Sequence, residues 1–112
     1  MSITIHSKDN TEEVLTEMAK AKERGLWAIG ATAEGYAKDV ITSEGRVDTG
    51  RMRNSVTHVE EDDATYIGTN VEYAPYNELG TVNMRGIHFL RRAATEHKDE
   101  YEELMKDSLE NA

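Results

Sequence analysis

An apolar stripe with the period of an α-helix runs through the first third of the sequence. At about 100° per residue, its members fall within an arc of roughly 80°. The stripe predicts one amphipathic helix over about residues 10–43, which would be roughly 50 Å long at 1.5 Å per residue. Its members are Leu15, Met18, Leu26, Ile29, Ala33, Tyr36 and Val40, with Lys22 as the one polar side chain among them.

The segment before this stripe contains a helix start signal. Asn10 or Asp9 is a suitable N-cap, and Glu13 or Glu12 three positions later completes a capping-box pattern. Upstream of these residues, "SITIH" at positions 2–6 alternates isoleucine with polar residues. That alternation predicts a short, half-buried β-strand ahead of the helix.

Glycines interrupt the predicted helix at regular intervals. Gly25, Gly30 and Gly35 are spaced by five residues, and each is expected to cost about 1 kcal/mol relative to alanine. Because a spacing of five turns each glycine by about 140°, the three cannot form one close-packed seam. We therefore expect a bend or a local break near Gly25. Gly45 is suited to end the helix.

The rest of the chain alternates strand and helix signals. Stretches rich in β-branched and aromatic residues flank an acidic turn and predict an antiparallel hairpin over about residues 55–70. Pro75 and Gly80 are suited to the first turn and the end of a short helix over about residues 74–80. Residues 88–110 return to helical spacing and predict a second long amphipathic helix. The stripe of this helix contains Leu90, Ala93, Ala94, His97, Tyr101, Leu104, Met105 and Ser108.

These elements predict one α+β domain over residues 1–112. Its two long amphipathic helices would pack on a small antiparallel sheet, with the short helix after the hairpin. Trp27 falls about 120° from the centre of the first stripe, among charged residues, so we expect it to be exposed. An exposed tryptophan is typical of a contact between subunits or of a patch covered by loops of the same chain.

The charge and cysteine content exclude several classes of protein. The chain has 13 Lys and Arg against 22 Asp and Glu, a net charge of -9. This balance argues against sequence-independent capture of nucleic acid, which relies on basic residues neutralising phosphates. The absence of cysteine excludes disulfides and thiolate chemistry. With neither a signal-peptide pattern nor a membrane-length apolar run, we expect a soluble cytosolic product and no membrane partner.

The segment "RVDTGRMRNS" at residues 46–55 contains Asp48-Thr49-Gly50, the tripeptide of the aspartic protease dyad. A homodimeric aspartic protease is therefore an alternative function, although Arg51 and Arg53 would oppose the shared proton of such a dyad. The same arginines around one glycine could bind an anion, but a Gly-rich phosphate-binding pattern is missing. The simplest interpretation is a turn between a helix and a strand.

The remaining candidate groups do not form a catalytic or metal-binding pattern. The histidines have no pairing at metal-ligand spacing and no cysteine to complete a zinc site. His97 lies on the second apolar stripe and is expected to be packed and hydrogen-bonded. We therefore predict no catalytic residues, no metal and no cofactor. The four histidines are His6, His58, His88 and His97.

Three segments, taken in order, carry a resemblance to a known family. They are "VDTGRMRNSV", "YIGTNVEYAPYNELGT" and "FLRRAATEHKDEYEELM". The chain resembles small neck proteins of long-tailed bacteriophages and prophages, which are described as tail-component, tail-completion or head-tail joining proteins. The match covers about residues 46–105 by motif and the whole chain by order of elements.

The resemblance implies a non-enzymatic structural role in the virion. Copies would form a ring, hexameric in the family, between the connector or neck proteins and the tail tube or tail terminator proteins. The protein would be in the host cytoplasm during assembly, and DNA would pass through the ring lumen, with which the acidic charge agrees. Family relatives usually carry prolines near residues 81–88, whereas this chain has Gly86 and Ile87, so that loop is expected to be mobile or ordered by a neighbour.

The resemblance also identifies candidate residues. The basic turn and the tyrosine-containing second motif would supply fold or subunit contacts, and Trp27 is added by its predicted exposure. The candidates are Trp27, Arg51, Arg53, Asn54, Tyr73, Tyr76, Glu78 and Gly80.

Overall fold

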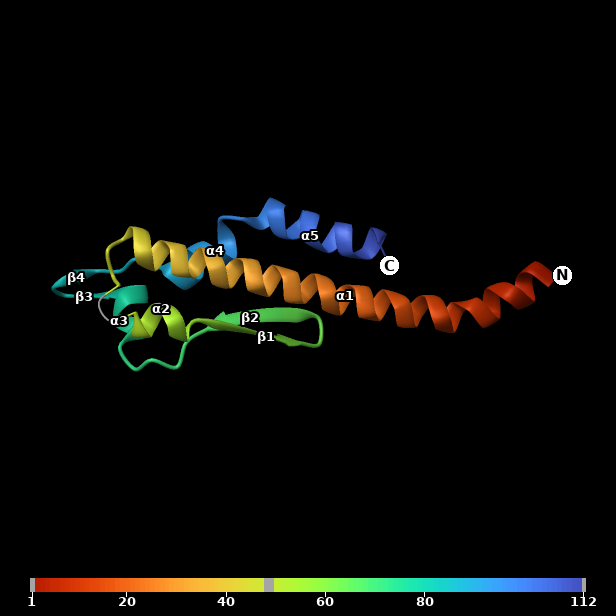
Figure 1. The fold of residues 1–112 in the computed structure, drawn as a ribbon, viewed down its shortest axis with the longest axis horizontal. Helices are drawn as coiled ribbons and strands as arrows, with labels where there is room; N and C mark the ends of the chain where they lie inside the picture. The colour runs from red at the N-terminus through yellow and green to blue at the C-terminus, as the bar shows by residue number, and fades with distance from the viewer. Residues whose placement is uncertain (1, 48–49, 112) are drawn as a thin grey trace.

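The computed structural model describes the backbone of residues 2–47 and 50–111 and the side chains of residues 11–47 and 50–111. One long helix, α1, is the axis on which the other elements pack (Figure 1). A β-hairpin lies on one side of α1, and the C-terminal helix α5 lies on the other. The architecture is α+β, as predicted. The elements are α1 (Ser2–Ser43), α2 (Arg51–Ser55), β1 (Thr57–Glu61), β2 (Ala64–Gly68), α3 (Ala74–Leu79), β3 (Gly80–Thr81), β4 (Met84–Arg85), α4 (Phe89–Thr95) and α5 (Lys98–Glu110).

Helix α1 begins earlier than predicted and ends where predicted. The strand expected at residues 2–6 is wrong, because α1 is already helical from Ser2. The described sheets are two-stranded hairpins that pair only with themselves, so this segment has no neighbouring strand. At the other end, Gly45 adopts φ 70°. The amide of Gly45 donates to Thr42 O, and that of Arg46 donates to Ile41 O. This is a Schellman motif, which satisfies the last carbonyls of the helix.

The glycines of α1 do not interrupt the helix, which is continuous from Ser2 to Ser43, so the expected local break near Gly25 is wrong. A Cβ on Gly25 would lie 2.7 Å from Met105 Sδ on α5, and a Cβ on Gly30 would lie 2.6 Å from His58 Nδ1 on β1. Gly35 has open space around it. Because successive glycines point about 140° apart around the helix, Gly25 faces α5 and Gly30 faces the hairpin.

The hairpin and α3 form where the sequence predicts them. Strands β1 and β2 are antiparallel, with Val59 opposite Tyr66 and His58 opposite Ile67. Helix α3 has Pro75 in its first turn and Gly80 at its C-cap. The sequence did not predict helix α2, which follows Gly50 directly and buries Met52.

The single C-terminal helix predicted over residues 88–110 is instead two helices. Helix α4 ends at Thr95 and α5 begins at Lys98, and the chain changes direction between them (Figure 1). Helix α4 buries Phe89 and Ala93 in the core, whereas no residue of α5 is fully buried. The break lets the first segment fill the core and the second lie along α1.

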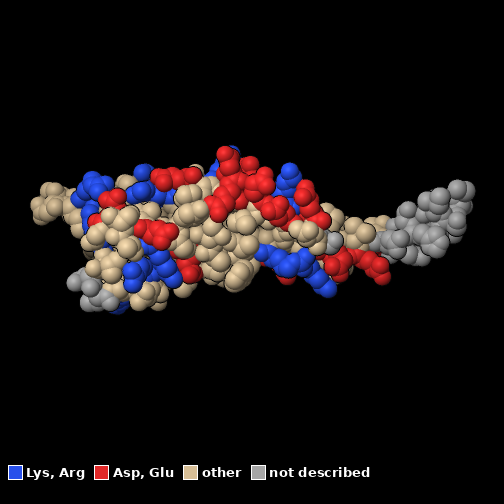
Figure 2. All heavy atoms as spheres, turned by 45° about the horizontal axis from the view of Figure 1, so that its top comes forward, with Lys and Arg blue, Asp and Glu red and all other residues tan. Residues whose placement is uncertain are grey.

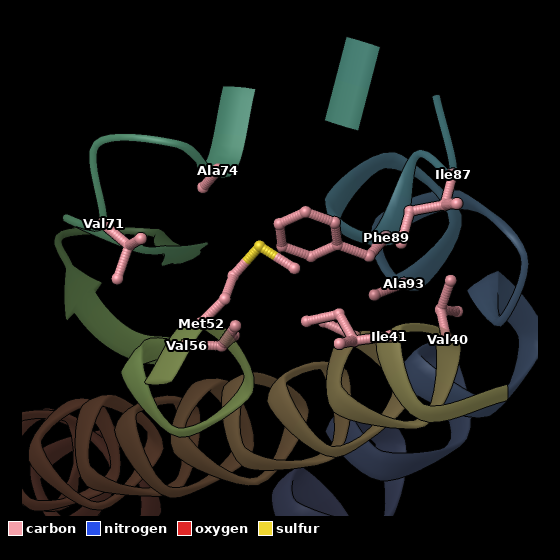
Figure 3. Packing of buried hydrophobic residues seen from close by; sticks show 10 residues of the cluster. Val40, Ile41, Met52, Val56, Val71, Ala74, Ile87, Phe89 and Ala93 are labelled. Atoms are coloured by element: carbon pink, nitrogen blue, oxygen red, sulfur yellow. The ribbon is translucent and has the colours of Figure 1, made fainter. Parts of the chain in front are cut away.

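The core lies at the end of the molecule where α1, α2 and α4 meet. Figure 3 shows Met52 pointing toward the ring of Phe89, with Ile41 beneath them. The largest fully buried side chains are Phe89, Ile41, Ile87 and Val56. The chain is nevertheless extended, with principal-axis extents of 72 × 24 × 21 Å. Its core therefore occupies one end of an elongated molecule.

Candidate subunit-contact surfaces

Arg51 of the basic turn binds a carboxylate of its own chain. Its Nη1 and Nη2 atoms donate to the two carboxylate oxygens of Glu72 at 3.0 Å each. The guanidinium carbon also lies 5.6 Å from the centroid of the Tyr73 ring. The hydrogen bonds from Arg51 lower the pKa of Glu72. Arg51 therefore joins α2 to the segment that leads into α3.

The other members of the basic turn make local contacts. Arg53 Nη1 lies 3.4 Å from Thr42 Oγ1 near the end of α1, and the amide of Asn54 donates to Gly50 O at 2.9 Å. Gly50 precedes α2 with φ 83°, a conformation that favours glycine. Arg53 thus connects α2 to the end of α1, and the Asn54 amide closes the first turn of α2 on Gly50.

Glu78 caps the N-terminus of α4. Its Oε1 accepts from the amide of Leu90 at 2.8 Å, and its Oε2 accepts from the amide of Arg91 at 3.1 Å. The first amides of a helix have no partner within the helix, so an acceptor supplied from outside stabilises this end. The motif resemblance identified Glu78 as a candidate fold or subunit contact, but it did not indicate that Glu78 binds the first amides of α4.

Gly80 and Gly86 allow two backbones to approach closely after α3. Gly80 has φ 90°, and a Cβ on Gly86 would lie 2.6 Å from the carbonyl carbon of Leu79. Within this segment β3 and β4 form a small hairpin, in which Gly80 is opposite Arg85. The departure from the proline-containing pattern thus has a structural use. Mobility and ordering by a neighbour remain predictions for residues 81–88.

Trp27 and Tyr76 are the most exposed aromatic candidates. Trp27 is 59% exposed and Tyr76 is 58% exposed. The Trp27 ring meets the His58 ring edge-on, with centroids 5.6 Å apart. The hairpin therefore supports one side of Trp27 and leaves the rest of its surface accessible, as its place on the helical wheel predicted.

Sequence reasoning missed a polar cluster that joins the end of α1 to α3, β4 and α4. Arg46 donates to Asn77 Oδ1 at 2.9 Å and to Arg85 O at 2.7 Å. Glu44 pairs with the side chains of Arg85 and Arg92. Hydrogen bonding from Arg85 is the largest cause of the lowered pKa of Glu44. These contacts join residues more than 30 positions apart, so spacing along the sequence does not reveal them.

Sequence reasoning also missed an uncovered apolar ridge near the start of α1. Val14, Leu15 and Met18 form this ridge and are 52%, 61% and 49% exposed. Two contacts of α5 and the hairpin with α1 lie at Ala21 and Lys22, next to the ridge. Ser108 of α5 donates to Ala21 O at 2.6 Å, and Asp63 at the hairpin tip pairs with Lys22. The helical stripe was predicted correctly, but not the point at which its cover ends.

A groove beside α3 lies toward the other end of the molecule. It has a volume of about 350 Å³ and apolar walls from Val71, Ala74, Pro75, Leu79 and Leu90. The two carboxylates in its wall are bonded within the chain, Glu72 to Arg51 and Glu78 to the start of α4.

Most of the arginines lie around the same end of the molecule. Figure 2 shows basic and acidic side chains together at that end, and a large acidic group with some basic side chains nearer the middle of the visible face. Six of the seven arginines come from the segments that build the groove end. They are Arg46, Arg51, Arg53, Arg85, Arg91 and Arg92.

The described residues contain no cluster of His, Asp and Glu suited to a metal ion. His97 is packed as expected, since its ring stacks on Tyr36 with centroids 3.5 Å apart. Asp48 and Thr49 lie outside the described residues. The protease alternative therefore stays a prediction that the geometry does not address.

No family model, curated protein or solved structure matched this chain in the comparisons. Among the described residues, no helix is long and apolar enough to cross a membrane.

Proposed function

We propose that this chain is a non-enzymatic structural protein of the bacteriophage virion that acts at the head-tail junction. Copies would form an oligomeric ring, hexameric by analogy with the neck family, that joins or completes the tail. Its partners would be its own copies, the connector or neck proteins, and the tail tube or tail terminator proteins. DNA would only pass through the lumen, where the acidic charge of the chain would limit adhesion.

The observation that carries this proposal is the exposed apolar surface at both ends of an elongated chain. Leu15 is 61% exposed near one end, and Leu79 is 73% and Val82 102% exposed at the other. Large apolar side chains in exposed groups are typical of surfaces that bind other proteins. The three motif resemblances support the particular setting of the phage neck.

The candidate residues divide into two groups. Arg51, Glu78 and Gly80 are engaged in intramolecular contacts or a special backbone conformation, so we assign them to the framework. Tyr76 and Trp27 keep more than half of their surface exposed, so we assign them to contacts with other subunits or neck proteins.

The proposal is tested in particles of the phage or prophage that encodes this chain. We expect mass spectrometry to find the chain in purified virions and cryo-electron microscopy to place its density between connector and tail. Removing its coding sequence should yield filled heads and separate tails, and expression in trans should restore joined particles. Absence of the chain from virions, or normal joining without it, would refute the role.

A single substitution separates this role from the protease alternative. Asp48→Asn should leave head-tail joining unchanged, because the proposed role needs no acid at that position. A protease would instead lose acid-pH peptide cleavage in this variant, and joining would fail only if it depended on cleavage. Peptide cleavage and particle assembly are therefore measured side by side for the variant and the unaltered chain.

A further inference from the structure

We infer that the ridge of one copy, Val14, Leu15 and Met18, docks into the groove beside α3 of a second copy. The contact is head to tail, because it joins two different surfaces of the same chain. The inference rests on the proposed assembly role, since it names the partner of the same exposed surfaces. It specifies which surfaces meet, which the assembly role alone leaves open.

The ridge is left largely exposed by the described part of its own chain. Leu15 and Met18 continue the stripe that buries Leu26, Ala33 and Val40 further along α1, with Val14 beside them. The contacts of α5 and the hairpin at Ala21 and Lys22 leave all three about half exposed or more. Helical periodicity places all three on one face of α1. A helix with such an apolar face binds an apolar groove through residues spaced three and four apart.

The groove has the complementary shape and chemistry. Its walls are mostly apolar, with Thr69, Asn70 and the two bonded carboxylates as the polar members, and its volume of about 350 Å³ admits more than one aliphatic side chain. Leu79 at its edge is 73% exposed and therefore adds apolar surface to the contact. The intramolecular bonds of Glu72 and Glu78 reduce the cost of covering these two carboxylates with apolar side chains.

Charge favours the groove of a second copy, rather than the ridge of a second copy, as the partner of the ridge. Every charged residue from 11 to 19 is acidic. Glu12 and Glu17 flank the ridge at about 110° on either side, and Glu17 also pairs with the exposed Lys20 at 3.9 Å. Packing two ridges together would bring these carboxylates against those of the partner. Arg91 lies close to the groove instead, because its amide donates to the wall residue Glu78 at 3.1 Å, and its side chain is exposed. Opposite charges at the rim of an interface increase association and fix its orientation.

A head-to-tail contact also sets the kind of assembly. Each copy offers one ridge and one groove, so a row of bound copies leaves one free groove at one end and one free ridge at the other for further copies. Such an interface produces a closed ring when the rotation between copies closes and a filament when it does not. An isologous ridge-to-ridge contact would instead stop at a dimer.

Crosslinking tests the pairing directly, because the natural chain has no cysteine. One preparation carries Leu15→Cys, and a second, mass-labelled preparation carries Leu79→Cys. After mixing and adding a short thiol-reactive crosslinker, we expect mixed products that join position 15 to position 79 to exceed both kinds of homodimer at least tenfold. The matched control pairs Leu15→Cys with Tyr66→Cys, an exposed residue on the hairpin, and should give only background. Homodimers through position 15, or no product above background, would overturn the contact.

A charge swap tests the orientation without relying on a cysteine at the apolar surfaces. Glu12→Lys with Glu17→Lys should weaken self-association measured by light scattering at least tenfold, and Arg91→Glu should restore it when combined with them. Glu102→Lys with Glu103→Lys on α5 makes the same change in charge away from both surfaces and serves as the control. Equal effects in both charge variants, or failure of Arg91→Glu to restore association, would contradict the inference.

The outcomes for the contact and for the phage role are distinguishable. A chain that crosslinks head to tail but is absent from virions would refute the proposed function and leave the contact established. A chain present in virions that does not form the mixed crosslink would refute the contact alone.

Discussion

At the scale of single residues, Glu78 connects the second sequence motif to the start of α4. Both of its carboxylate oxygens accept amide hydrogen bonds there. Glu78→Ala should lower the free energy of unfolding by about 1–2 kcal/mol, because two helix amides lose their acceptor. Chemical denaturation measures this loss. As a control, Glu96→Ala at the exposed end of α4 should change stability by less than about 0.5 kcal/mol. Equal losses in the two variants would show that the cap contributes nothing.

Tyr101 provides a test based on pH. Its hydroxyl donates to Ala93 O across the break between α4 and α5, and burial raises its pKa to about 12 from 10.0. The folded state therefore favours the neutral phenol. This contribution to stability is fully present below pH 10 and is lost as the pH rises from about 10 to 12.

Tyr101→Phe removes both the hydrogen bond and the titrating group. We expect stability at neutral pH to fall by about 1 kcal/mol and its decline above pH 10 to become less steep. Chemical denaturation at a series of pH values, with tyrosinate absorbance recorded in parallel, measures both effects. Tyr66→Phe on the exposed hairpin surface is the control. An unchanged pH profile in Tyr101→Phe would contradict the assignment.

At the scale of elements, the glycines of α1 form a matched series within one helix. Gly35→Ala should stabilise the protein by about 0.5–1 kcal/mol, because alanine favours helix and the site has open space. Gly30→Ala should destabilise it by about 1–3 kcal/mol, since the new Cβ would crowd His58 and Thr65. Gly25→Ala should fall between the two, because Met105 is flexible enough to move. Thermal unfolding of the three variants gives the order, and any other ranking would contradict the two-sided packing of α1.

Local sequence signals predicted the elements whose causes are local. The stripe through Val40, the stop at Gly45 and the start at Pro75 depend on neighbouring residues, and the structure confirms them. The alternation at residues 2–6 is too short to distinguish strand from helix. No glycine or proline marks the break after Thr95 in the sequence. The break arises because α4 packs in the core and α5 packs along α1, so local backbone preference does not predict it.

The sequence identified the candidate contact residues, but it did not predict which groups they bind. Arg51 binds Glu72, 21 residues away, and Glu78 binds amides 12 and 13 residues away. Side-chain type shows that such residues can form strong hydrogen bonds, but only the fold brings a particular partner near. The uncovered ridge was missed for the same reason, since its exposure depends on where α5 and the hairpin end.

At the scale of the whole molecule, stability and exposed binding surface are separated along one axis. The radius of gyration is 19.0 Å, whereas a compact domain of this length has roughly 13 Å. The excess comes from α1, which extends past the cover of α5 and the hairpin (Figure 1). One end of the molecule therefore has a core that stabilises it. At the other end, the first part of α1 is stabilised mainly by the hydrogen bonds within the helix.

Hydrogen exchange along α1 should therefore change in steps within one continuous helix. Amides near Ile41, which is fully buried, should exchange only through global unfolding, whereas amides of residues 11–20 should exchange through local fraying. By the same reasoning, Leu15→Ala should change stability by less than about 0.5 kcal/mol, and Ile41→Ala should cost about 2–5 kcal/mol.

Measurements on dilute protein report on single copies that are not docked. At higher concentration, docking of the ridge should slow exchange in residues 11–20 while leaving the region of Ile41 unchanged. Uniform protection along α1 in dilute protein would contradict the separation.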